Sequence, residues 1–233
     1  SLIEIKKGKV LEVGCGRGSL SAYFSDAGWD CTLLDISENV IKTAQDAFRK
    51  NKLNAKFDIG NCLELPYKSN KFDLVFSIGL LEHFEDVFPV IREQHRVLKP
   101  GGLFIGYVVP FMENNIQSDY IWFNEILKTL MEKKIDHGHQ KHEVFRSDHL
   151  SDHYKPILKK LKFKNIQSDG IYSLPMISHS PEFPFTLLPN EAETVLVKTF
   201  NKMLFELGEK RKDKDGWRCK EGKGNAFLIW AKK

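Results

Sequence analysis

The chain has 233 residues, of which 42% are hydrophobic and 28% charged, and 35 basic against 31 acidic side chains give a formal net charge of +4. This length and composition fit one α/β domain with a sizeable core and exclude a second full domain, and the mixed charge does not indicate a nucleic-acid-binding protein. The four cysteines lack C-x-x-C spacing, which excludes a zinc knuckle or a disulfide framework and favours a reducing compartment.

A glycine-rich loop lies near the beginning of the chain, in the stretch KVLEVGCGRGSL of residues 9–20. An apolar run there predicts a short buried strand, and three glycines, Gly14, Gly16 and Gly18, separate it from a helical pattern that begins at Leu20. Backbone N–H groups in such a loop can approach a ligand closely. The dinucleotide fingerprint G-x-G-x-x-G requires the last glycine one residue later, where Ser19 stands, so a nicotinamide or flavin cofactor is disfavoured.

The pattern Glu12-x-Gly14-x-Gly16-x-Gly18 resembles motif I of the class I methyltransferases that use S-adenosylmethionine (SAM). The resemblance implies that these four residues lie at a SAM site and that S-adenosylhomocysteine is the product. A tight turn without a ligand is the alternative explanation of the glycines.

The second predicted strand, residues 31–34, ends in Asp35 and Ile36, and Ser37 is placed to cap the helix that follows. A carboxylate at this strand end can accept hydrogen bonds from both ribose hydroxyls, and the apolar residue after it can pack on adenine. Alternatively, Asp35 only caps the helix.

A third strand, about residues 55–59, leads into the sequence GNCLELP of residues 60–66. This segment resembles the G-D-A-x-x-L-P motif that contacts adenine in the same methyltransferases, with Asn61 in the position of the usual aspartate. By this resemblance the Asn61 carbonyl oxygen accepts a hydrogen bond from the adenine amino group, and Cys62 lies against the adenine edge. Simple packing at the strand end would explain Cys62 equally well.

The fourth strand, residues 71–77, is followed by GLLEHF at residues 79–84. The (Asp/Asn)-Pro-Pro-(Tyr/Phe) sequence of adenine and cytosine amino-methyltransferases is absent from this position. The segment resembles the LEH segment of the ubiquinone and menaquinone methylases and of small-molecule O-methyltransferases. This implies that Ser77 and Ile78 meet the methionine part of SAM through backbone groups and that His83 lies close by. The alternative for His83 is a histidine at the beginning of a helix that bonds only backbone.

A helical face from Phe84 to Leu98 includes His95, which is predicted to be a core residue. The sequence RVLKPGG of residues 96–102 resembles the turn before the fifth strand of the same families, and that strand is predicted at residues 103–109.

The acceptor side is predicted to be built after the fifth strand, where an aromatic-rich helix begins near Ser118. Five of the eight histidines lie within residues 137–153, but their spacing matches no zinc signature, so no metal site is predicted. The residues around His139 and His142 resemble the G-H-x-x-x-F segment of related methyltransferases, in which a histidine can approach the acceptor. These two residues are therefore the candidates for proton removal, and a solvated loop of histidines is the alternative.

The remaining chain predicts a helix over residues 147–161, a strand near 163–173 and a last strand at 225–231. Between these strands, residues 174–224 contain a capped helix from Asn190 to Gly208, expected either as a cap over the acceptor pocket or as a dimer surface.

Together these patterns predict a single domain over residues 1–233 with the α/β fold of a three-layer sandwich. By resemblance it has a seven-stranded, mostly parallel sheet whose last strand is antiparallel, with cap-like helical insertions at about 110–146 and 174–224. The expected function is SAM-dependent methyl transfer to oxygen or nitrogen of a small molecule. An RNA (tRNA-type) methyltransferase and a non-catalytic SAM-binding scaffold are the alternatives.

The protein is expected to be a cytoplasmic monomer or homodimer. No membrane span is expected, because no apolar run reaches about 18 residues. Related methyltransferases usually begin with helices that cover the cofactor, and only eight residues precede Lys9, so an N-terminal segment is expected to be missing from this sequence.

Overall fold

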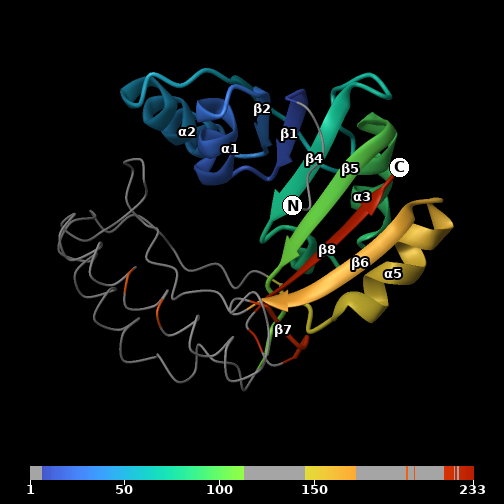
Figure 1. The fold of residues 1–233 in the computed structure, drawn as a ribbon. Helices are drawn as coiled ribbons and strands as arrows, with labels where there is room; N and C mark the ends of the chain where they lie inside the picture. The colour runs from blue at the N-terminus through green and yellow to red at the C-terminus, as the bar shows by residue number, and fades with distance from the viewer. Residues whose placement is uncertain are drawn as a thin grey trace.

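The computed structural model describes residues 7–112, 145–171, 218–222 and 226–233, together with residues 198, 202 and 224 (Figure 1). In chain order the described helices and strands are β1 Lys9–Val13, α1 Ser19–Asp26, β2 Asp30–Asp35, α2 Glu38–Lys50, β3 Lys56–Ile59, β4 Phe72–Ile78, a 3-10 turn at Leu81–His83, α3 Phe88–Val97, β5 Leu98–Val108, α5 Ser151–Lys160, β6 Lys164–Ile171, β7 Arg218–Cys219 and β8 Ala226–Lys232.

These strands form one sheet in the order β3-β2-β1-β4-β5-β8-β6-β7. Strands β1 to β5 are parallel to one another, whereas β8 is antiparallel to both β5 and β6. The mostly parallel sheet with an antiparallel last strand is therefore confirmed. The strand count is eight rather than seven, because the two-residue β7 adds to the edge beside β6 within the predicted insertion. Two residues are too few for an alternating pattern to reveal a strand in the sequence.

Helices cover the two faces of the sheet and produce the three layers (Figure 1). One core lies under α1 and α2, where Ala22, Ile41 and Phe48 pack on alternate residues of β1, β2 and β4. The other lies under α3 and α5, where Ile91 and Leu158 pack on the opposite side of the same strands. Strands buried on both faces read as continuous apolar runs, which is why the sequence pattern located them.

Local signals position the first two helices as the sequence predicts. The Ser37 side chain accepts a hydrogen bond from the backbone N–H of Val40 and caps α2. Gly28, with a φ of 83°, follows the end of α1 in the left-handed conformation that glycine adopts without strain.

Two boundaries differ from the prediction. Helix α3 begins at Phe88 rather than Phe84, because Asp86 accepts from the Phe88 N–H and Pro89 occupies the first turn. Strand β5 begins at Leu98, so the predicted turn at residues 96–102 is partly strand, with a shift of register against β4 between Phe72 and Leu74. His95 is half-buried at the edge of the core. Its ring lies edge-on to the Phe163 ring, with 4.7 Å between the ring centroids.

The two predicted cap-like insertions fall largely on residues 113–144 and 172–217, which lie outside the described residues apart from residues 198 and 202. The single-domain boundaries and the cap therefore stay predictions. Among the described residues, no helix combines the length and apolar character needed to cross a membrane.

Candidate cofactor and active site

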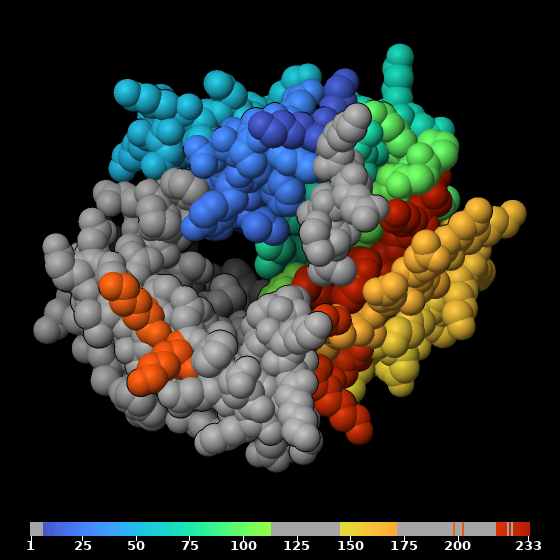
Figure 2. Space-filling view, viewed as in Figure 1, coloured from blue at the N-terminus to red at the C-terminus, as the bar shows by residue number. Residues whose placement is uncertain are grey.

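The strand order reverses direction between β1 and β4, and the glycine loop of residues 14–18 lies at this point. Ligands of open α/β sheets bind outside the carboxyl ends of the strands at such a switch point. In Figure 2 the surface is hollowed next to the blue N-terminal part, by the green ends of β4 and β5.

Gly14, Gly16 and Gly18 all have positive φ, between 52° and 71°, so the loop uses the left-handed conformation three times. Two of the loop's N–H groups, those of Gly14 and Cys15, donate to the Leu34 carbonyl at the end of β2. A Cβ at Gly14 would lie 2.8 Å from the Leu80 side chain, so the segment after β4 packs directly on the loop.

Asp35 connects the end of β2 to the glycine loop. Its Oδ2 accepts from the Gly16 N–H at 3.0 Å, and its Oδ1 accepts from the Ser37 N–H at 3.0 Å. A carboxylate has about four acceptor positions, so each oxygen retains one for a further donor. The role of helix cap and the role of ribose acceptor are therefore compatible in this geometry.

Large apolar side chains are exposed around Asp35. Ile36 is 72% exposed, and Ile59, the register partner of Asp35 on β3, is 56% exposed. Leu63, in the loop after β3, is exposed as well. Apolar groups gathered beside a polar anchor are typical of a ligand-binding surface. Ile59 and Leu63 were not among the site residues predicted from the sequence.

Asn61 is exposed, and its Oδ1 accepts from the Leu63 N–H at 2.9 Å. This bond identifies the amide oxygen, which keeps a second acceptor position, so Asn61 offers a ligand both an acceptor and the donors of its N–H₂ group. Cys62 is partly buried against the core beneath α3, and burial raises the pKa of its thiol.

Glu12 lies inside the protein, with 3% of its surface exposed, and accepts a hydrogen bond from Ser21 Oγ of α1. Burial is the main reason that the pKa of Glu12 rises to about 8, although the Ser21 bonds oppose the shift. The side chain thus joins β1 to α1 behind the glycine loop.

Ser77 and Ile78 end β4 and line a cavity of about 240 Å³. The other lining residues come from α1, β4, β5 and β8 and are apolar apart from Tyr107. They are Leu20, Phe24, Phe76, Ile105, Tyr107 and Leu228. The cavity adjoins the beginning of α1, so it lies next to the glycine loop.

His83 ends the 3-10 turn that follows β4, and its Nδ1 lies 2.7 Å from the Phe145 carbonyl oxygen. The contact with backbone matches the second of the two alternatives for this residue and involves one of its two ring nitrogens.

The remaining histidine predictions have different outcomes. His139 and His142 lie outside the described residues. His149 and His153 stack with ring centroids 3.8 Å apart, and the described part of the chain holds no group of three or more potential metal ligands.

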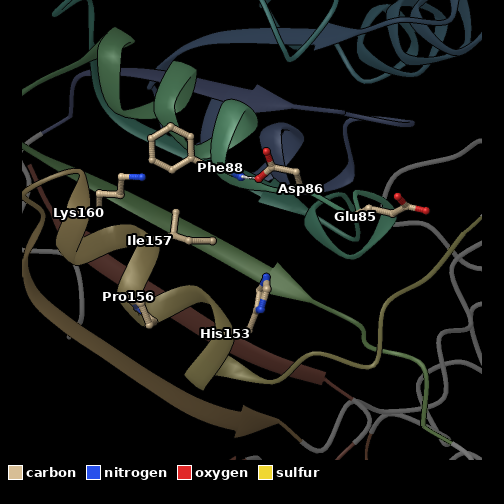
Figure 3. Close-up of a pocket in the computed structure, with 7 residues that line it drawn as sticks. All are labelled: Glu85, Asp86, Phe88, His153, Pro156, Ile157 and Lys160. Atoms are coloured by element: carbon tan, nitrogen blue, oxygen red, sulfur yellow. Dashed lines mark hydrogen bonds between the residues drawn. The ribbon is translucent and has the colours of Figure 1, made fainter.

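His153 lines a second hollow of about 400 Å³ between α3 and α5 (Figure 3). Its rim carries Glu85, Asp86 and Lys160, and its apolar wall is formed by Phe88, Pro156 and Ile157. Since these residues belong to the helical layer, this hollow is separate from the glycine loop.

Comparison with known proteins supports the site at the strand ends. Residues 11–106, from β1 to β5, match a family model described as a methyltransferase domain. Over these residues the chain is similar to methyltransferases. The matched region contains every predicted cofactor residue from Glu12 to His83.

Curated relatives of the methyltransferase domain act on different acceptor atoms. Norajmaline N-methyltransferase of Rauvolfia serpentina is 37% identical over 99 residues, which is 41% of this chain and 34% of the relative. The chloroplastic tocopherol O-methyltransferase of Arabidopsis thaliana is 35% identical over 118 residues, 49% of this chain and 33% of the relative. The matched region therefore spans only about a third of these relatives.

The fold of the whole chain is shared with solved methyltransferase structures. Phosphoethanolamine N-methyltransferase 2 of Haemonchus contortus, solved with SAM, aligns over 98% of this chain and 49% of its own length. The TM-score is 0.58 at 19% identity, a level that establishes the fold but not the substrate.

Proposed function

We propose that this protein transfers a methyl group from SAM to an oxygen or nitrogen atom of a small molecule. The observation that carries the proposal is the bonded unit of Asp35 and the glycine loop, with exposed Ile36 and Ile59 beside it, inside a methyltransferase domain. Polar anchors and apolar surface thus alternate along one edge of the sheet, as the polar ribose and flat adenine of SAM require.

The described residues fit SAM as follows. The free acceptor positions of Asp35 suit the ribose hydroxyls, and Ile36 and Ile59 suit the two sides of the adenine ring. Asn61 can accept from the adenine amino group through the remaining acceptor position of its Oδ1, or donate to a ring nitrogen of adenine through its N–H₂ group. The methionine part belongs beside Ser77 and Ile78.

SAM supplies an already activated methyl group, so the main task of the protein is to hold the acceptor in line with it. The amino-methyltransferase signature for nucleobases is absent after β4, and the N- and O-methyltransferase relatives favour a small acceptor. His139 and His142 are proposed on the acceptor side. The cytoplasmic setting and the monomeric or dimeric state stay predictions.

The test is calorimetric titration with SAM, followed by a screen of phenols, alcohols and amines that measures release of S-adenosylhomocysteine. We expect SAM binding and turnover of at least one small acceptor. Turnover of RNA alone, with RNA binding that weakens steeply as salt rises, would instead indicate the RNA enzyme. SAM binding without any product would indicate the scaffold.

A further inference from the structure

His83 ends the 3-10 turn that follows Leu80, the residue of this segment that packs on the glycine loop. The Leu80 side chain packs on Gly14, and the backbone N–H of His83 donates to the Leu80 carbonyl at 3.1 Å. The imidazole is partly exposed, whereas Leu81 and Glu82 before it are buried. The turn therefore holds one titratable ring at the surface, beside the loop on which SAM is proposed to lie.

The ring has one defined tautomer. Nδ1 lies 2.7 Å from the Phe145 carbonyl oxygen, and a carbonyl oxygen can only accept a hydrogen bond. Nδ1 must therefore carry the proton in the neutral ring, which leaves the lone pair on Nε2. A ring oriented in this way by a backbone acceptor is the arrangement that a general base needs.

The Phe145 carbonyl is itself held in place through Glu82. The Ser147 N–H donates to the Glu82 carbonyl at 2.8 Å, and Glu82 Oε1 accepts from the Val109 N–H at the end of β5. Glu82 has none of its surface exposed, and burial raises the pKa of its carboxyl, while the charges of His83 and Arg146 oppose that shift.

We propose that His83 Nε2 is the base that removes the acceptor's proton during methyl transfer, an inference that rests on the proposed function. The acceptor oxygen or nitrogen forms its bond to the methyl carbon as its proton passes to Nε2, and the electrons of the broken carbon–sulfur bond stay on sulfur. The imidazolium then loses that proton to solvent. The Phe145 carbonyl accepts from Nδ1–H throughout and stabilises the charged ring.

The first test needs no acceptor. Long-range proton–nitrogen NMR of the protein should show His83 with its proton on Nδ1. Diethyl pyrocarbonate, mapped by mass spectrometry, should modify His83, and saturating S-adenosylhomocysteine should slow this modification at least about tenfold while His153 reacts unchanged. A proton on Nε2, or no protection, overturns the inference.

The second test compares His83→Asn with His153→Asn, because the asparagine amide can still donate to the Phe145 carbonyl but cannot accept a proton. With a hydroxyl acceptor from the screen, kcat of H83N should fall at least about 100-fold, the order expected for loss of a general base. H153N should keep both the SAM affinity and the kcat of the wild type, because His153 lines the separate hollow between α3 and α5.

The outcomes separate the two proposals. Turnover that H83N leaves unaltered, or turnover only of tertiary amines or thioethers, which have no proton to lose, overturns the role of His83 but not methyl transfer. Failure of every acceptor despite SAM binding overturns both.

Discussion

At the scale of single residues, Asp35 is the side chain that most directly links structure to ligand binding. Its two oxygens are held by the N–H groups of Gly16 and Ser37, so their remaining acceptor positions have a defined direction. Such a preorganised carboxylate loses little conformational entropy when donors from a ligand arrive.

We expect Asp35→Ala to weaken SAM binding by at least about 1 kcal/mol, the order expected for lost charge-assisted hydrogen bonds. Asp35→Asn, which retains one acceptor oxygen, should lose less. Calorimetry measures both, with Asp46→Ala as control, since Asp46 pairs only with Arg49 on the exposed side of α2. Unchanged affinity of D35A would remove Asp35 from the ribose site.

Glu12 shows a different consequence of burial. The pKa of about 8 in the folded protein exceeds the ordinary glutamate value of 4.5, so the folded state retains a proton that the unfolded chain releases. Stability is therefore greatest at low pH with respect to this group and declines as pH rises from about 4.5 to 8.

Glu12→Gln removes this titration, so the free energy of unfolding of the variant, relative to that of wild type, should increase with pH. The gain should be at least about 1 kcal/mol at pH 9, since one pKa unit corresponds to about 1.4 kcal/mol. Urea unfolding at pH 6 and pH 9 measures the difference. Glu64→Gln, at an exposed position, is the control. A gain that is identical at both pH values would contradict the assigned shift.

His139 and His142 provide a further prediction at this scale, because their assignment depends only on sequence resemblance. Substitution of either by asparagine should leave SAM affinity unchanged and slow methyl transfer through poorer placement of the acceptor. Calorimetry and the rate of S-adenosylhomocysteine release separate the two effects. An unaltered rate in both variants would remove these histidines from the mechanism.

At the scale of the elements, the glycine loop is shaped by close packing as well as by ligand access. A Cβ on Gly18 would approach Leu33 Cδ2 to 2.3 Å and Phe48 to 3.2 Å, and both side chains are buried. Gly16 has open space around it, so the loop combines one glycine needed for helix packing with one that leaves room beside Asp35.

Gly18→Ala should destabilise the fold at least about 1 kcal/mol more than Gly101→Ala, because overpacking typically costs about 1–3 kcal/mol. Gly101 is a matched control, with a φ of 78° but no atom within 4 Å of its added Cβ. Both variants carry the backbone strain of a positive φ, so chemical unfolding of the pair isolates the steric cost. Equal losses would show that Leu33 and Phe48 move aside.

At the scale of the whole molecule, Lys233 joins the last strand to the helical layer. Its Nζ donates to the carbonyls of His95 and Leu98 at the end of α3 and to Asn70 Oδ1, at 2.8 to 2.9 Å. A cation at a helix C-terminus is favourable, although burial lowers the pKa of this amine.

Lys233→Met should lower the free energy of unfolding by about 1–3 kcal/mol, the range for hydrogen bonds to charged groups. For a chain of this size, each kcal/mol lowers Tm by roughly 2–4 °C. Lys232→Met is the matched control, because Lys232 is the exposed neighbour. Thermal unfolding followed by circular dichroism measures both. A loss as large in K232M would show that the effect is not due to the α3 contacts.

The sequence by itself determined the parallel sheet, the crossover helices and the position of the glycine loop. These features depend on local patterns, namely apolar runs, helical periodicity and glycine spacing, which the amino-acid order states directly. It also located Asp35 and His83 at strand ends, although it could not decide between a structural and a ligand-binding role for either residue.

Tertiary structure alone decided which groups face one another. The exposure of Ile59 beside Asp35, the bond from His83 Nδ1 to Phe145, the burial of Glu12 and the edge strand β7 each depend on chain segments brought together by the sheet. His83 and Phe145 are 62 residues apart, and no local pattern specifies a hydrogen bond over that separation. Position along the chain therefore identified candidate residues, and the fold determined which of their atoms can act.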